Sequence, residues 1–195
     1  EIGRALAPIP FGPSVAVATE ALLHFGSEEQ RRRHLPRLAA GELVGAFAAA
    51  EGGGDAVPEV PRTRFEGGRI HGEKLPVLDG GSADLCVVVA SGSAGPTLVL
   101  VDLRGPGVAR TPLTSFDPSR PQCRIAFDGA PAEALGPAVG AGAIRTLLDR
   151  AAVMAGFEQL GGASRAFEIT REYALGRYAF GRPIASFQAL KHRLA

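Results

Sequence analysis

The sequence predicts an α+β protein: a helical segment, then a central antiparallel β-barrel domain, then the start of a C-terminal helical bundle. Three observations carry this prediction. Residues 27–30 read Ser-Glu-Glu-Gln, the capping box that begins a helix. From residue 44, short apolar runs alternate with turn-forming residues, as in strands. Between about residues 140 and 176, apolar side chains recur every three or four positions, as on one face of a helix.

The first helices are predicted on either side of Gly26. Residues 14–25 are mostly small and apolar and end at this glycine, and the second helix begins at the capping box. Pro36 is expected to end the second helix at about Leu35, because proline removes a helical hydrogen bond and clashes with the preceding turn. A turn through Gly41 then leads into the barrel.

Seven short strands are predicted between residues 45 and 127. Gly67 and Gly68 join two of them into a hairpin, because glycine readily adopts the positive φ of tight turns. Regularly spaced short strands are typical of a compact antiparallel barrel. The expected strands are 45–50, 61–66, 69–72, 85–90, 97–103, 107–111 and 122–127, followed by a linker over 128–137.

A long helix is predicted over about residues 140–176. Gly181 and Pro183 end the helical pattern, because glycine fits the left-handed conformation after a helix and proline cannot continue one. Pro183 is expected to open the next helix at its first position. The apolar stripe of the long helix consists of Ile144, Leu147, Leu148, Ala151 and Met154.

Composition excludes several classes of function. The 195 residues contain 21 Lys and Arg against 20 Asp and Glu, without the concentrated basic patch of a nucleic-acid-binding protein. Two cysteines are too few for a disulfide framework, so Cys86 and Cys123 are interpreted as reduced core residues. The histidines do not lie at metal-ligand spacing, so no metal site is predicted.

Three further features bear on location, completeness and phosphate binding. No apolar run approaches the ~20 residues needed to span a bilayer, and no signal peptide is recognised, so a cytoplasmic protein is expected. The chain starts at Glu1 and stops within a helical pattern, as expected for a piece of a longer protein. The glycines at 52–54 are not a phosphate-binding loop, because no Lys-Ser or Lys-Thr follows them.

Residues 177–192 contain the most informative motif of the chain. They read Arg-Tyr-Ala-Phe-Gly-Arg-Pro-Ile-Ala-Ser-Phe-Gln-Ala-Leu-Lys-His. On packing grounds alone this is a helix-turn-helix corner, with Phe180 in the core and Arg177 as a solvated charge. The run nevertheless resembles the signature of the acyl-CoA dehydrogenase family, and residues 26–43 resemble the end of that family's N-terminal helical domain.

The resemblance spans the whole chain and implies three domains. Residues 1–43 would end the N-terminal helical domain, 44–135 would form the β-barrel middle domain, and 136–195 would start the C-terminal helical-bundle domain. It also implies that Arg177, Phe180 and Gln188 reach the FAD of a neighbouring subunit. The chemistry is suitable, because a guanidinium pairs with phosphate oxygens and an aromatic ring stacks on a flavin or an adenine.

The chain departs from the family where its own flavin is expected. Compared with the family motif, the run from Phe47 to Asp55 is two positions shorter and lacks hydroxyl side chains. Pro76 replaces a ring that covers the flavin. Each lost hydrogen bond costs about 0.5–1.5 kcal/mol, so FAD binding by this chain alone stays in doubt. The residues implied on this face are Phe47, Ala49, Ala50, Pro76 and Leu78, the last in place of a hydroxyl facing flavin N5.

The family reaction also requires a carboxylate base. That base usually lies beyond the residues present here, and in a minority of members it lies on the long helix, at the position that reads Ala151. Alanine cannot accept a proton. Glu158 is the nearest carboxylate, and we interpret it as a structural or surface residue. No catalytic residue is therefore predicted within the chain.

The resemblance leaves alternative functions open. The first is an acyl-CoA dehydrogenase flavoprotein that oxidises an acyl-CoA with FAD and passes electrons to an electron-transfer flavoprotein. The second is a non-catalytic partner subunit that completes a neighbour's FAD site. Both imply assembly with same-fold subunits as a dimer or tetramer. A third is a truncated, non-functional product with exposed apolar faces. The sequence does not distinguish an acyl chain from a steroid as the substrate.

Overall fold

The computed structural model describes residues 1–136 and 139–195, which fall into two compact units. The barrel unit is Pro8–Ala152, and the helical unit combines Glu1–Ala7 with Val153–Ala195. The three-domain division at residues 43 and 135 stays a prediction about the complete protein. The end of the predicted linker over 128–137 lies outside the described residues.

The helices of the barrel unit follow the sequence signals closely. A π-helix, η1 (Phe11–Thr19), continues into α2 (Glu20–Phe25), so the predicted first helix begins three residues earlier than expected. The capping box of α3 (Glu28–Ala39) is confirmed: the Gln30 N–H donates to Ser27 Oγ at 3.2 Å, and the Ser27 N–H donates to Gln30 Oε1 at 2.9 Å.

Helix α3 was predicted to end at about Leu35, before Pro36. It instead continues to Ala39. Leu35 and Leu38 pack against the core of the unit, and this packing offsets the one hydrogen bond that proline removes. Gly41 ends the helix with φ of 71°, and its N–H donates to the Leu38 carbonyl at 3.1 Å. The stop signal is therefore the glycine rather than the proline.

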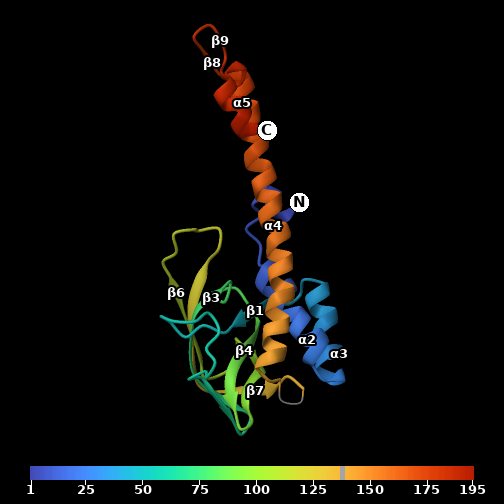
Figure 1. Cartoon of the computed structure of the whole chain (residues 1–195). Coiled ribbons are helices and arrows are strands. Elements are labelled where there is room, and N and C mark those ends of the chain that lie inside the picture. Colours follow the sequence, from blue (N-terminus) through green and yellow to red (C-terminus); the bar gives the residue numbers. More distant parts are fainter. Residues whose placement is uncertain (137–138) are drawn as a thin grey trace. The chain divides into compact units, whose positions relative to one another are not determined.

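The predicted barrel is confirmed, with all seven strands (Figure 1). Strands β2, β3, β7, β5 and β4 close into a ring, while β1 pairs with β4 and β6 pairs with β7. The pairing differs in one respect from a purely antiparallel barrel, because β1 and β2 both run parallel to β4. The strands are β1 (Gly45–Ala48), β2 (Arg64–Glu66), β3 (Arg69–Leu78), β4 (Leu85–Gly92), β5 (Gly95–Asp102), β6 (Val108–Leu113) and β7 (Gln122–Ala134).

Two strands are longer than the sequence indicates. Strand β3 runs past Gly72 to Leu78, although it carries Lys74 with its side chain fully buried. Strand β7 extends through residues assigned to the linker, because its end pairs with both β3 and β5. Tertiary pairing thus overrides the charged and turn-forming residues that suggested earlier ends.

The core of the barrel unit consists of two apolar clusters. The first is enclosed by the strands and includes Ile70, Val88 and Ile125. The second lies between the sheet and the helices, where Leu22 meets residues of β4 and β5. The first turns of α4 (Ala141–Gly176) belong to this second cluster through Ile144, Leu147 and Leu148.

The helical unit is built on the rest of α4, the 36-residue helix predicted over 140–176. Helix α1 (Ile2–Ala5) packs closely against it, since a Cβ added at Gly3 would lie 1.8 Å from the Glu158 carbonyl oxygen. After Gly176 the chain forms the hairpin β8 (Tyr178–Ala179) and β9 (Arg182–Pro183), a 3-10 turn η2 (Ile184–Ser186) and α5 (Gln188–Leu194).

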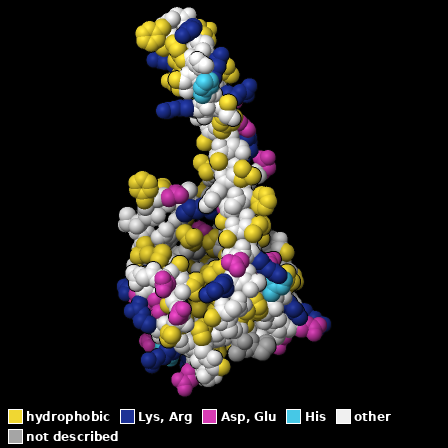
Figure 2. Space-filling view, in the orientation of Figure 1, with side chains coloured by type: hydrophobic (Ala, Val, Ile, Leu, Met, Phe, Trp, Pro, Cys, Tyr) yellow, Lys and Arg dark blue, Asp and Glu magenta, His cyan; other side chains and the backbone are white. Residues whose placement is uncertain are grey.

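This hairpin corrects the predicted helix-turn-helix corner. Pro183 lies in β9 instead of opening a helix, and Phe180 is 95% exposed instead of buried in a core. Apolar side chains also gather on the exposed surface of α4 within the helical unit (Figure 2). They include Val153, Phe157, Leu160, Phe167, Ile169, Tyr173 and Leu175. In the part of the chain that the structure describes, no helix has the length and apolar character to cross a membrane.

Candidate functional site

Three of the predicted site residues lie on or beside the β8–β9 hairpin. Arg177 precedes the hairpin, Phe180 is in its turn, and Gln188 begins α5. The Ile184 N–H donates to the Arg177 carbonyl at 2.8 Å, which closes the hairpin at its base. All three side chains are exposed, so they are accessible to a ligand or to another subunit.

The turn at Phe180 has an unusual backbone. Phe180 and Gly181 have φ of 53° and 74°, as in the type I′ turns that normally carry Asn-Gly. A bulky residue at positive φ is uncommon and strained. The Phe180 ring makes an edge contact with Phe187 at 6.3 Å between centroids, yet it stays almost fully exposed. Packing and turn geometry therefore do not explain why a phenylalanine occupies this position.

The surroundings of the hairpin are cationic. Residues 173–195 contain no Asp or Glu, and their cations are Arg177, Arg182, Lys191 and Arg193. The Arg182 guanidinium lies 4.2 Å from the centroid of the Phe187 ring, a cation–π contact that orients it. An exposed ring beside several cations and an amide is a chemically suitable surface for the pyrophosphate and rings of a dinucleotide.

The other predicted site residues lie in the barrel unit, on two adjoining segments. Phe47 and Ala49 face the helix-side cluster, where Ala49 is buried and Phe47 is half-buried. Pro76 and Leu78 are exposed on β3. The segments meet where the Leu75 N–H donates to the Ala50 carbonyl at 3.0 Å.

A buried ion pair, which the sequence reasoning missed, joins these segments. Lys74 Nζ donates to Glu51 Oε1 and to the Ala49 carbonyl, both at 2.8 Å. Lys74 is fully buried and Glu51 is 8% exposed. The sequence did carry a signal for this pair. Glu51 lies in the run from Phe47 to Asp55, Lys74 lies two residues before Pro76, and neither charge can be buried alone.

The environment of this pair holds Glu51 ionised. Burial raises the pKa of the Glu51 carboxyl, but the Lys74 ammonium and the N–H groups of Thr63 and Arg62 outweigh burial and lower that pKa to about 2. Burial lowers the pKa of Lys74, and the Glu51 carboxylate opposes this effect. The Glu51 carboxyl is therefore ionised at neutral pH, and its oxygens are engaged by Lys74, Thr63 and Arg62 within the fold.

The barrel face offers few groups to a flavin. Ala50, Pro76 and Leu78 provide no polar side-chain atom, and the carbonyls of Ala49 and Ala50 already accept hydrogen bonds. The side chains at this face thus offer no hydrogen bond to a flavin's polar edge, which leaves the backbone N–H groups to meet it. The side chains at the hairpin fit an FAD pyrophosphate and ring. Within residues 1–136 and 139–195, no cluster of three or more His, Cys, Asp or Glu could hold a metal ion.

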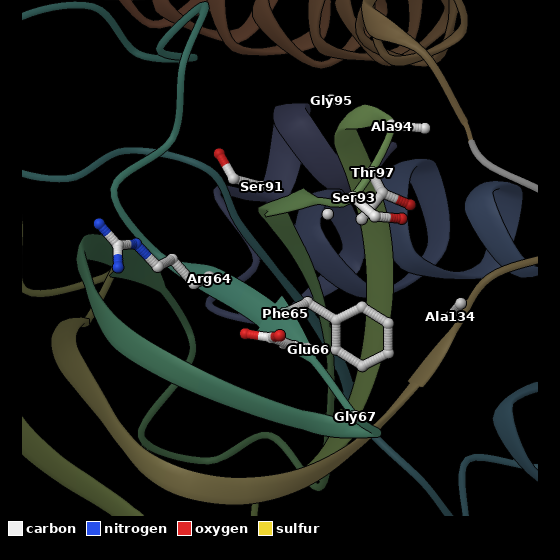
Figure 3. A pocket seen from close by; sticks show the side chains of 11 residues that line it. Arg64, Phe65, Glu66, Gly67, Ser91, Ser93, Ala94, Gly95, Thr97 and Ala134 are labelled. Carbon is white, nitrogen blue, oxygen red and sulfur yellow. The ribbon is translucent and has the colours of Figure 1, made fainter.

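A separate hollow of about 550 Å³ lies between β2 and the β4–β5 hairpin (Figure 3). The side chains of Arg64, Glu66, Ser91 and Thr97 line it, with the Phe65 ring at one side. Ser91 Oγ donates to the Pro61 carbonyl at 2.6 Å and so is already engaged. None of the predicted site residues lines this hollow.

The two positions considered for a catalytic base both lie on α4. Ala151 is half-buried at the end of the barrel unit. Glu158 is half-buried in the helical unit, where its backbone meets α1. This placement agrees with a structural role for Glu158, and its use as a base stays without support.

Comparisons with known proteins agree with these motifs. The family model for the acyl-CoA dehydrogenase N-terminal domain matches residues 1–42, and the model for the acyl-CoA dehydrogenase C-terminal domain matches residues 139–195. The acyl-CoA dehydrogenase IpdE2 of Mycobacterium tuberculosis is 32% identical over 195 residues, which are the whole of this chain and 48% of that protein.

Solved structures extend the similarity to the fold. The ChsE4-ChsE5 complex from Mycobacterium tuberculosis matches with a TM-score of 0.86 and 30% identity, over 99% of this chain and 52% of that one. A glutaryl-CoA dehydrogenase from Mycobacterium smegmatis in complex with FADH2 matches with a TM-score of 0.86 and 26% identity, over 94% and 50%. The chain thus spans about half the length of these relatives, and it belongs to the acyl-CoA dehydrogenase family.

Proposed function

We propose that the chain is part of an acyl-CoA dehydrogenase flavoprotein that oxidises an acyl-CoA thioester. FAD held by the assembly would supply the acceptor for the hydride, a carboxylate base of the assembly would take the proton, and an electron-transfer flavoprotein would take up the two electrons. The observation that carries the proposal is the hairpin, on which an exposed and strained Phe180 lies beside Arg177 and before Gln188. A strained residue that packing does not require is typical of a functional site.

The residues of this chain would bind and orient the cofactor. Arg177 would pair with the pyrophosphate, Phe180 would stack on a ring, and Gln188 would donate its amide N–H groups. By the family resemblance these contacts go to the FAD of a neighbouring same-fold subunit. The exposed apolar side chains of α4 support assembly with such subunits, because large apolar surfaces mark interaction sites.

The visible spectrum of the purified full-length protein tests the proposal. We expect a flavin band at one FAD per site that is bleached by an acyl-CoA. The variant Phe180→Asn sharpens the test, because Asn-Gly is the preferred sequence of this turn and should keep the hairpin folded. It should lose FAD while its melting temperature stays at or above that of the wild type. Unchanged FAD content in this variant would contradict the role of the ring.

A second candidate function is favoured by the barrel face. Ala50, Pro76 and Leu78 lack the side-chain contacts that the family uses, so the chain is alternatively a partner subunit that only completes a neighbour's FAD site. Supporting this alternative, the ChsE4-ChsE5 match is a complex of two differently named proteins. An isolated protein that is colourless, and gains flavin only with a same-fold partner, would favour this function. A stoichiometric yellow band in the isolated protein would exclude it.

A further inference from the structure

The two ends of the loop between β1 and β2 meet at Glu51. This residue follows β1, and its carboxylate accepts hydrogen bonds from the backbone N–H groups at the far end of the loop. The Arg62 N–H lies 2.7 Å from Oε2, and the Thr63 N–H lies 2.9 Å from Oε1. The Arg62 guanidinium also donates to the Glu51 carbonyl. Most residues in the middle of the loop are exposed, so contacts at Glu51 join its two ends.

The same region is tied to β3 at four points. Lys74 Nζ contacts Glu51 Oε1 and the Ala49 carbonyl. The Leu75 N–H donates to the Ala50 carbonyl at 3.0 Å, and the Gly52 N–H donates to the Leu75 carbonyl at 2.9 Å. Between Lys74 and Val77 the register of β3 with β7 is shifted. These four ties therefore link that stretch of β3 to residues 49–52.

The ties also fix the direction of two backbone donors. In a planar trans peptide the N–H points opposite to the carbonyl oxygen of the preceding residue. Because the Ala49 carbonyl points to Lys74, the Ala50 N–H points away from Lys74. Because the Ala50 carbonyl points to the Leu75 N–H, the Glu51 N–H points away from Leu75.

We propose that Glu51 and Lys74 are positioning residues of the barrel's cofactor face, where their buried contact holds residues 49–52 and loop 52–61 in one orientation against β3. This inference rests on the proposed function, because it assigns the face to FAD. The pair acts through the backbone that it orients, so it can preserve the shape of the face even where the contacting side chains are apolar.

The test uses the full-length protein with any same-fold partner it requires, and the double variant Glu51→Gln with Lys74→Met. Replacing both members of a buried pair by uncharged residues of similar volume is often neutral for stability. The control is Glu73→Gln, which breaks the more exposed pair with Arg124 next to Lys74 on β3. Three quantities are measured: the melting temperature, the rate of Glu-C cleavage after exposed Glu59, and the Kd for FAD.

We expect the double variant to keep its melting temperature within about 4 °C of the wild type. Its cleavage rate and its Kd for FAD should each rise about tenfold or more, while the control resembles the wild type. If the pair only supports the fold, a double variant with a near-wild-type melting temperature would also have an unchanged Kd and an unchanged cleavage rate. That result would overturn the inference.

Two further outcomes separate this inference from the proposed function. If the wild type binds no FAD at this face, the assignment of the face to FAD fails. The positioning of the loop is then decided by the cleavage rate alone. Faster cleavage of the double variant than of the wild type supports positioning, and equal cleavage overturns it. If the double variant does not fold, Glu51→Asp keeps the negative charge beside Lys74 but shortens the reach of the carboxylate to the loop, and the same two readouts decide.

Discussion

The hairpin and the barrel face carry different parts of the proposed cofactor site. At the hairpin the contact groups are present and exposed, and the backbone of Phe180 is strained to present its ring. At the barrel face the backbone is held by a buried ion pair, but Ala50 and Leu78 offer no polar contact. The hairpin therefore offers contact groups, whereas the barrel face offers a backbone held in place.

The largest effect is expected from removing only one half of the buried pair. Lys74→Met leaves the Glu51 carboxylate buried without its cation, and breaking such a pair costs about 3–5 kcal/mol of unfolding free energy. Urea denaturation of the full-length protein measures this loss. The double variant with Glu51→Gln should recover most of it, and a Lys74→Met protein as stable as the wild type would show that the pair is not coupled to folding.

The next effect concerns the hairpin. Arg177→Ala should weaken FAD binding by about 1.5–3 kcal/mol, because it removes a charge-assisted contact to phosphate. Its melting temperature should not change, since the side chain is exposed. Equilibrium dialysis with FAD measures the Kd, and Arg193→Ala is the matched control from the same cationic surface. Equal Kd values for the two variants would leave only general charge attraction.

A smaller effect is expected at Asp79, which follows Leu78. Among the described residues, no hydrogen-bond partner reaches its buried Oδ2 atom, and burial raises the pKa of this carboxyl above its ordinary value of 3.8. The folded state therefore binds this proton more tightly than the unfolded state does, so stability falls as the pH rises above 3.8 through the folded pKa.

Asp79→Asn removes that dependence and suits the positive φ of 54° at this position. It should raise the unfolding free energy at pH 7 by about 1–2 kcal/mol. In acid, below pH 3.8, the two proteins should be equally stable. Denaturation at both pH values checks the sign, and a variant that is less stable at pH 7 would contradict it.

The smallest effect tests the barrel face directly. Leu78→Thr and Ala50→Thr restore hydroxyls where the family carries them, and each should strengthen FAD binding by about 0.5–1.5 kcal/mol. The Kd for FAD of the single and double variants measures the gain. Pro112→Thr on β6 is a control outside the predicted contacts. No gain in the double variant would mean that the face no longer receives a flavin.

The fold was largely predictable because its signals are local. The capping box, the Gly67-Gly68 turn and the first part of the α4 stripe each depend on neighbouring residues, and each was confirmed. Met154, at the end of the predicted stripe, is instead 42% exposed. The end of α3 was wrong because burial of Leu35 and Leu38 outweighs the bond lost at Pro36. The parallel pairing of β1 with β4 was not foreseen, since it joins residues about forty positions apart.

The site was predictable in part. Family motifs pointed to Arg177, Phe180 and Gln188, and the structure gathers them on or beside one hairpin. The contact of Glu51 with Lys74 could not be derived from spacing, because it depends on how the β1–β2 loop lies against β3. The hint in the sequence was that both charges lie beside the residues assigned to the flavin face.

The shifted register of β3 near Leu75 provides a natural spectroscopic reporter. The Leu75 amide proton is held by the Ala50 carbonyl, whereas the rest of β3 pairs with the neighbouring strands β2 and β7. Hydrogen exchange at this single amide therefore follows the opening of residues 49–52, while its neighbours follow the opening of the barrel. Comparing the two rates in one sample separates local release of the cofactor face from global unfolding without any substitution.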